Sequence, residues 1–151
     1  MAIEELIIPP VAQIRNLLKD FETKVPVWGL IVFTVDGYVL AHQPCKDDMP
    51  ENLELAFSSM SVGLITISED FIRLVDSAKL FRQILVDAED ENKEPAFSIF
   101  LRHVAENVML ACIFPSKVRI GLLAFELEIL GNQIDEIVNL WDIKLHNNTV
   151  T

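Results

Sequence analysis

The chain has 151 residues, a length typical of one domain with its own hydrophobic core. It has 12 Lys and Arg against 23 Asp and Glu, a formal net charge of −11, so a nucleic-acid backbone would be repelled and is excluded as the main partner. Hydrophobic residues make up 51% of the chain, which excludes a disordered protein and indicates that some apolar surface contacts another protein.

The longest apolar runs, such as Val108–Pro115 and Gly121–Phe125, are far shorter than the roughly 20 residues of a membrane-spanning helix. We therefore expect no membrane insertion. The acidic start lacks the basic leader of a signal peptide, which predicts a cytoplasmic protein. In that compartment we expect two free thiols, Cys45 near the surface in a polar loop and Cys112 buried in an apolar strand.

The first predicted elements are a helix and a hairpin. Apolar residues at helical spacing predict a helix over Pro10–Lys24, with a proline suited to its first position. The β-rich runs Val27–Val35 and Tyr38–Ala41 flank Asp36-Gly37, a pair typical of a tight hairpin turn.

A long helix is predicted from a capping box at Asp48–Glu51 to about Lys79. One set of its apolar side chains recurs every three or four positions and is assigned to the face that packs on the sheet. These are Leu53, Ala56, Phe57, Met60, Leu64, Ile67, Phe71, Leu74, Val75 and Ala78. A second stripe is predicted to face outward: Leu55, Ser58, Val62, Ile65 and Ile72. Small residues form a flank between the two: Ala56, Ser59, Gly63 and Thr66.

Three further strands are predicted at Phe81–Ala88, Ala96–Val104 and Val108–Phe114, the last two joined by a short turn. The acidic run Asp87–Glu94 lacks the alternating oxygen ligands and the glycine of a calcium loop. We therefore favour a solvated loop over an ion-binding one.

A final helix is predicted after Ser116. Its apolar stripe runs to Trp141 and continues past Gly131, which favours one helix with a glycine that costs about 1 kcal/mol over two helices. From Lys144 we expect a loose tail.

No constellation of catalytic residues is found. His42, His103 and His146 show no metal-ligand spacing, and no phosphate-binding loop is present. Ser58, Ser59 and Ser61 lie within the long helix, where their small size fits close packing better than nucleophilic chemistry. We expect a protein that is not an enzyme and that binds no metal, nucleotide or other cofactor.

The order of the predicted elements indicates an α+β fold with a five-stranded antiparallel sheet sandwiched between helices. Two segments carry a family resemblance: Trp28–Ala41, with its Asp-Gly turn, and Val108–Phe114 followed by Arg119–Leu123. On these segments the chain resembles the roadblock/dynein light chain family, most of all its MglB-type regulators of small Ras-like GTPases. We expect one roadblock-like domain over residues 1–151, with a core from about 11 to 141, an arm at 1–8 and a tail at 144–151.

The resemblance implies a homodimer that joins the third strands of two sheets and lays the two long helices side by side. The strand Phe81–Ala88 would be an unprotected edge strand in a monomer, and this edge and the flank of small residues on the long helix agree with the arrangement. The implied dimer interface comprises Ala56, Ser59, Gly63, Thr66, Phe81, Gln83 and Leu85. The outward stripe would then bind the partner protein, through Leu55, Ser58, Val62, Ile65 and Ile72. Alternatively, the apolar arm Ile3–Ile8 covers this stripe and completes the core.

Two functions remain open, a regulator of a small Ras-like GTPase and a scaffold that assembles a complex without altering GTP hydrolysis. A small-molecule sensor is less favoured, because few polar groups converge among the bulky apolar strands. Arg73, Arg82, Arg102 and Arg119 are the candidates considered for an arginine finger, but none lies in a glycine-rich loop suited to insertion. Any stimulation of hydrolysis is therefore expected to act by positioning the GTPase's own residues.

Overall fold

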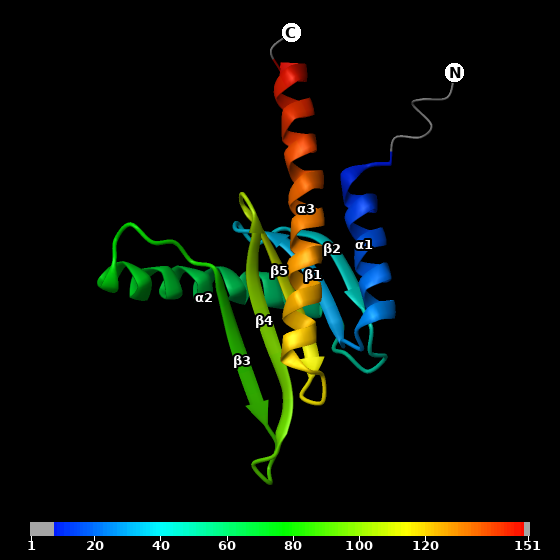
Figure 1. Ribbon diagram of the computed structural model, residues 1–151, viewed down its shortest axis with the longest axis vertical. Coiled ribbons are helices and arrows are strands. Elements are labelled where there is room, and N and C mark those ends of the chain that lie inside the picture. Colours follow the sequence, from blue (N-terminus) through cyan, green and yellow to red (C-terminus); the bar gives the residue numbers. More distant parts are fainter. Residues whose placement is uncertain (1–7, 150–151) are drawn as a thin grey trace.

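The protein was analysed as a computed structural model that describes the backbone of residues 8–149 and the side chains of residues 8–141. Its elements are α1 (Pro10–Lys24), β1 (Gly29–Thr34), β2 (Val39–Pro44), α2 (Leu53–Val75), β3 (Gln83–Glu89), β4 (Pro95–Ala105), β5 (Val108–Pro115) and α3 (Ile120–Thr149). The strands form one antiparallel sheet in the order β2-β1-β5-β4-β3 (Figure 1). The predicted fold class is confirmed.

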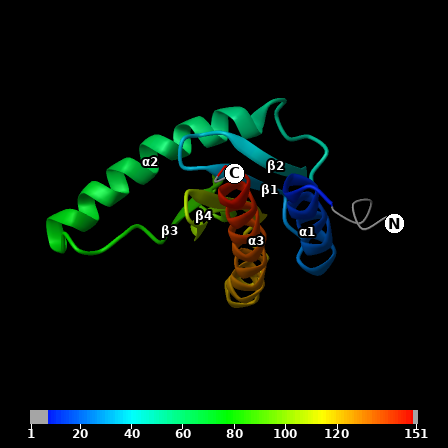
Figure 2. The same cartoon turned by 90° about the horizontal axis from the view of Figure 1, so that it is seen from above.

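Helices cover both faces of the sheet, with α1 and α3 on one side and α2 on the other (Figure 2). Because side chains alternate along a strand, Leu30 and Cys112 point toward α1 and α3, whereas Ile31 and Ala111 point toward α2. The cluster on the α1 and α3 face is the larger one. The cluster under α2 has fewer buried members: Ile31, Phe33, Ile65, Phe81, Leu101, Met109 and Ala111.

The first helix has its predicted bounds, and the predicted hairpin forms with Gly37 at φ 95° in its turn, a conformation that favours glycine. The capping box at Asp48–Glu51 does not form. Instead α2 begins at Leu53 after Asn52, which has φ 57° and makes no side-chain capping hydrogen bond. It ends at Val75, before the predicted Lys79, because the carboxylate of the extended Asp76 accepts the Ala78 N–H in a turn.

The strand β3 begins at Gln83, two residues later than predicted, and the side chain of Phe81 before it is buried in the cluster under α2. In the acidic loop, the Asp90 carboxylate accepts hydrogen bonds from the N–H groups of Asn92 and Glu94 at 2.8 and 3.0 Å. These bonds close an ordinary hairpin turn. Among the side chains of residues 8–141, no three His, Cys, Asp or Glu groups gather in a way that could hold a metal ion.

The last helix is longer than predicted. α3 passes through Gly131 and continues to Thr149, so the expected loose tail is wrong for residues 144–149. No glycine or proline follows Gly131, and nothing in the sequence stops the helix sooner. The arm at 1–7 and residues 150 and 151 lie outside the described residues.

Candidate interaction surface

The long helix α2 touches the sheet along a narrow line. Only Ser58, Ser61 and Ile65 are buried among its 23 residues. The two serines are buried on the side that faces the sheet, and the Ser58 hydroxyl donates to the Leu55 carbonyl of its own helix at 3.1 Å. Most of the helix surface is therefore available to another molecule.

The predicted outward stripe is wrong for four of its five residues. Ser58 and Ile65 are 1% and 6% exposed and face the sheet, and Val62 and Ile72 are half-buried beside them. Only Leu55 is exposed. The prediction assigned the largest apolar side chains to the core, whereas the structure places small and medium side chains there and leaves most of the large ones in solvent.

One flank of α2 faces the turn between β1 and β2. The Cγ2 atom of Val62 lies 3.3 Å from the position that a Cβ on Gly37 would take. About two helical turns after Val62, Glu69 lines a small cavity together with Val35 and Phe81. These contacts fix the rotation of the helix about its own axis.

The opposite flank of α2 is apolar and faces the other end of the sheet. At about 100° per residue, this flank contains the residues that the sequence assigns to the core. We call it the apolar flank: Leu53, Phe57, Met60, Leu64, Ile67, Phe71, Leu74 and Val75. Phe57 and Leu64 pack on the cluster under α2, whereas Met60 and Ile67 are exposed.

The C-terminal part of α2 extends past β3, the edge strand of the sheet (Figures 1 and 2). At this end of the helix, Phe71, Leu74 and Val75 are 67%, 83% and 90% exposed, whereas Ile72 still packs on the cluster under α2. We call the three exposed residues the overhang. Three adjacent large apolar side chains without a covering layer mark an interaction site.

The sequence carries a signal for this overhang that the prediction missed. A helix of 23 residues is about 35 Å long, whereas five strands about 4.8 Å apart span only about 20 Å. A helix that crosses such a sheet must overhang it by several turns. Apolar residues in those turns then predict an intermolecular contact.

The small residues of α2 face solvent. Ala56, Ser59, Gly63 and Thr66 are all exposed, on the side of the helix away from the sheet. A Cβ added to Gly63 would meet nothing within 4 Å. Nothing in the described chain requires a glycine at this position, although it weakens the helix.

The edge strand β3 offers unpaired backbone groups. The His103 N–H donates to the Arg82 carbonyl at 2.9 Å, and ladder bonds alternate in antiparallel pairs. Leu85 and Asp87 therefore direct their N–H and C=O groups away from β4. Leu85 and Val86 are 39% and 40% exposed, and Gln83 is exposed as well. Phe81, predicted to lie in the dimer interface, instead has its side chain in the core.

Part of the sheet on the α2 face lies outside the cover of α2. Ile84, Leu101, Ala111 and Ile31 form one row across the strands, and this row belongs to the cluster under the helix. The next row toward the far end of the sheet contains Val86 and Ile99, which remain partly exposed.

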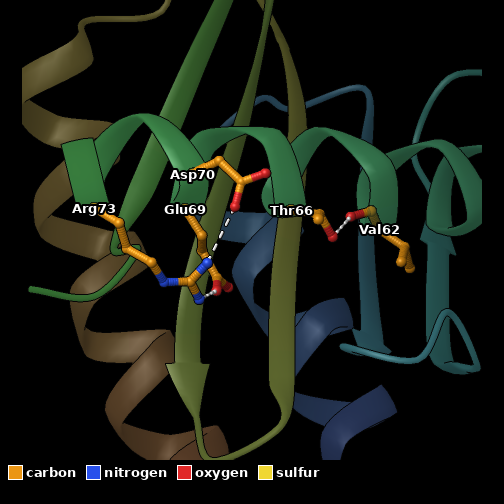
Figure 3. A network of polar contacts seen from close by, with 5 residues as sticks. All are labelled: Val62, Thr66, Glu69, Asp70 and Arg73. Carbon is orange, nitrogen blue, oxygen red and sulfur yellow. Dashed lines mark hydrogen bonds and ion pairs between the residues drawn. The ribbon is translucent and has the colours of Figure 1, made fainter. Parts of the chain in front are cut away.

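Charged side chains form a small network on α2 (Figure 3). Arg73 donates to Glu69 at 2.9 Å and to Asp70 at 3.1 Å, and the Thr66 hydroxyl donates to the Val62 carbonyl at 2.9 Å. The guanidinium is thus held by its own helix, and such exposed pairs contribute little stability. Arg82 and Arg119 are exposed and Arg102 is half-buried, each in or next to a strand or helix.

Burial shifts the pKa values of three groups that lie away from the β3 edge. Desolvation lowers the pKa of His42, and Glu54, whose carboxylate lies 3.3 Å from its Nδ1, acts in the opposite direction. Burial and then Glu22 raise the pKa of Cys45 to about 12, and burial raises that of Cys112. Both thiols are free, as predicted, with Cys112 buried and Cys45 half-buried.

By length and composition alone, α2 could cross a membrane. The sequence predicts no such helix, because its uninterrupted apolar runs are short. This test is also passed by helices that pack on proteins. Here the same helix lies along a sheet through Ser58, Ser61 and Ile65, beside a free sheet edge.

No protein-family model and no curated protein match this chain. Solved structures do. The gliding protein MglB from Thermus thermophilus superposes with a TM-score of 0.72 at 12% identity, covering 87% of this chain and 92% of that one. Myxococcus xanthus MglB gives 0.72 at 12% identity, covering 84% and 95%. A Roadblock/LC7 domain from Streptomyces avermitilis gives 0.70 at 14% identity, covering 82% and 96%. At these identities the likeness is one of fold.

Proposed function

We propose that this chain, which has the roadblock/LC7 fold, is a non-catalytic, dimeric, cytoplasmic regulator of a small Ras-like GTPase. The observation that carries the proposal is the apolar overhang of α2 beyond the unpaired edge of β3. The overhang of α2 and the edge of β3 lie along the same border of the sheet. A second copy of the chain can supply a strand for this edge and apolar cover for this helix end.

In the proposed dimer, β3 pairs antiparallel with β3 of a second copy about a two-fold axis perpendicular to the sheet. Leu85 then lies opposite the partner subunit's Leu85, and Gln83 lies opposite the partner subunit's Asp87. A register that opposes Asp87 to its own copy would place like charges together and is disfavoured. The paired strands form a continuous sheet of ten strands.

The same axis brings the two α2 helices together along their apolar flanks. Each overhang, with Phe71, Leu74 and Val75, lies over the row of Val86 and Ile99 in the other subunit. This contact covers the part of the sheet that α2 leaves open in its own chain. Burying such side chains stabilises the dimer by about 1.5–3 kcal/mol for each that becomes fully buried.

The outward side of the paired helices remains free to bind the GTPase. It carries Leu55 and the small residues Ala56, Ser59, Gly63 and Thr66, over which a partner backbone can approach closely. The proposed partner site therefore retains Leu55 from the predicted one and omits Ser58, Val62, Ile65 and Ile72. It adds the four small residues, which the sequence assigns to the dimer interface.

The regulator would act by holding the GTPase's switch segments. Arg82 and Arg119 are exposed and directly precede β3 and α3, and Arg73 is held by Glu69 and Asp70. Stimulation by an inserted arginine, worth roughly 10³–10⁵ in rate, is therefore not expected. Stimulation would instead come from positioning of the GTPase's own catalytic groups.

The test is single-turnover GTP hydrolysis by Ras-like GTPases of the same organism, with and without this protein. We expect faster hydrolysis with the wild type, and loss of both binding and stimulation with Gly63→Gln. Tyr38→Gln, an exposed substitution in the β1–β2 turn, is the matched control and should act as wild type.

The alternative is a roadblock scaffold that assembles a complex without altering hydrolysis. It is favoured by the extent of exposed apolar surface on α2. Binding of a GTPase that Gly63→Gln abolishes, with an unchanged hydrolysis rate, would establish the scaffold. Absence of any binding would refute both.

A further inference from the structure

An apolar groove of about 400 Å³ opens on the face of the molecule opposite α2, between the start of α1 and the C-terminal half of α3. Its walls include Pro9, Val11 and Ile14 from the α1 side and Val138 and Trp141 from α3. The volume lies in the range of about 300–1,000 Å³ typical of ligand sites. Trp141 remains 44% exposed at its rim.

The rim of the groove continues as an exposed apolar surface. Ile8 and Val11 at the start of α1, and Leu140 next to Trp141 on α3, are all exposed. Polar groups are confined to the lining contributed by Thr34, Glu106 and Asn107. The groove is thus suited to aliphatic side chains.

The chain enters this site from its own N-terminal side. Ile8 directly precedes Pro9, which lines the groove, and the Ile8 carbonyl accepts a hydrogen bond from Gln13 Nε2 at 2.6 Å. Pro9 is extended, with φ −56° and ψ 144°, and a residue before proline is itself biased to extended conformations. The point at which residues 1–7 join the groove is therefore fixed.

We propose that residues 1–7 bind in this groove, with the apolar side chains of Ile3, Leu6 and Ile7 in contact with Val138 and Trp141. Seven residues reach at most about 23 Å, enough to cover the groove and its rim. The sequence places Glu4 and Glu5 between the apolar positions, where they can remain in water. Because the segment is joined directly to the groove, its effective concentration is high and little affinity is needed.

A segment covering α2 is disfavoured by the same geometry. Ile8 lies at the start of α1, on the face that α1 shares with α3, whereas α2 lies on the other face of the sheet (Figure 2). The proposal is independent of the proposed function, since neither the β3 edge nor α2 takes part.

The test follows the fluorescence of Trp141 in a Trp28→Phe background, which leaves one tryptophan in the chain. Leu6→Ser with Ile7→Ser should raise acrylamide quenching of Trp141 about two-fold and shift its emission to the red, because apolar cover is lost. Glu4→Gln with Glu5→Gln is the matched control in the same segment and should leave both unchanged. Far-UV circular dichroism establishes that each variant is folded.

Three outcomes would overturn the proposal. Equal quenching in the double serine variant and its parent would show that the groove is open or filled by something else. If the difference in quenching between the double serine variant and its parent vanishes on dilution below the dimer dissociation constant, residues 1–7 of a second copy occupy the groove. A blue shift of Trp141 on addition of lauric acid to the wild type would assign it to an apolar small molecule.

Discussion

The Cγ1 atom of Val104 in β4 lies 3.0 Å from the position that a Cβ on Gly131 of α3 would take. The glycine therefore lets α3 lie close against β4, and its cost to the helix is offset by packing. Gly63 in α2 is the opposite case, since a Cβ there would meet nothing.

This contrast gives the first prediction. Gly131→Ala should lower the free energy of unfolding by about 1–3 kcal/mol, because Val104 is β-branched and cannot easily move away. Gly63→Ala should raise the free energy of unfolding by about 0.4–1 kcal/mol. Urea unfolding of both variants measures the difference. Equal effects of the two substitutions would contradict the packing role of Gly131.

The second prediction concerns the edge strand. Leu85→Lys should shift the protein from a dimer of 17.1 kDa chains toward the monomer, because a charge would enter the paired edge. Light scattering after gel filtration at micromolar concentration measures the mass. Tyr38→Lys, an equally charged change at an exposed turn, should leave the dimer intact. A monomeric wild type would refute the dimer itself.

The third prediction tests which side of α2 faces the sheet. Ile65→Asp should destabilise the protein by several kcal/mol, because its carboxylate would be buried without a partner. Leu55→Asp should change the stability by no more than about 0.5 kcal/mol, as is usual at exposed positions. Thermal or urea unfolding compares the two. Similar stabilities would mean that Ile65 is accessible to solvent.

The fourth prediction is a pH dependence. Because burial lowers the pKa of folded His42 below its ordinary value of 6.5, the unfolded chain binds more protons as the pH falls below about 6.5. Stability contributed by neutral His42 is present above that pH and is lost as the pH falls through the folded pKa. Urea unfolding from pH 7.5 to 5 should show a smaller slope for His42→Gln. An unchanged slope would place the pH dependence on other groups.

The fifth prediction concerns the thiols. With the pKa of Cys45 raised to about 12 and that of Cys112 raised by burial, both should react slowly with iodoacetamide at pH 8, since the thiolate is the nucleophile. Mass spectrometry should find both alkylated in 6 M guanidinium chloride. The Cys45 N–H donates to the Trp28 carbonyl at 2.9 Å, and rapid modification of Cys45 in the folded protein would show that this contact opens readily.

Local signals in the sequence were sufficient for most of the elements. The proline start and helical spacing of Pro10–Lys24 and the Asp-Gly turn at Gly37 act within a few residues, so neighbours in the chain decide them. The β-rich runs that form β4 and β5 act in the same way on adjacent residues. The fold class followed from these elements and their short connections.

The faces of α2 could not be assigned in this way. Apolar residues occur almost all round this helix, so periodicity alone does not distinguish a side chain that packs on the sheet from one that awaits another molecule. The choice depends on contacts distant in the sequence, such as Val62 with the Gly37 turn and Ile65 with the cluster of Phe81 and Leu101.

By itself, the sequence determined most of the helices and strands, although not all of their ends, and that its apolar content exceeds what one small domain buries. Only the tertiary structure decided where the excess lies. The sheet is narrower than α2 is long, and the side of the helix that faces the sheet contains Ser58, Ser61 and Ile65, so Met60, Ile67, Phe71 and Leu74 remain in solvent. The size and shape of the whole sheet decide which side chains of α2 are exposed, and no local sequence pattern encodes them.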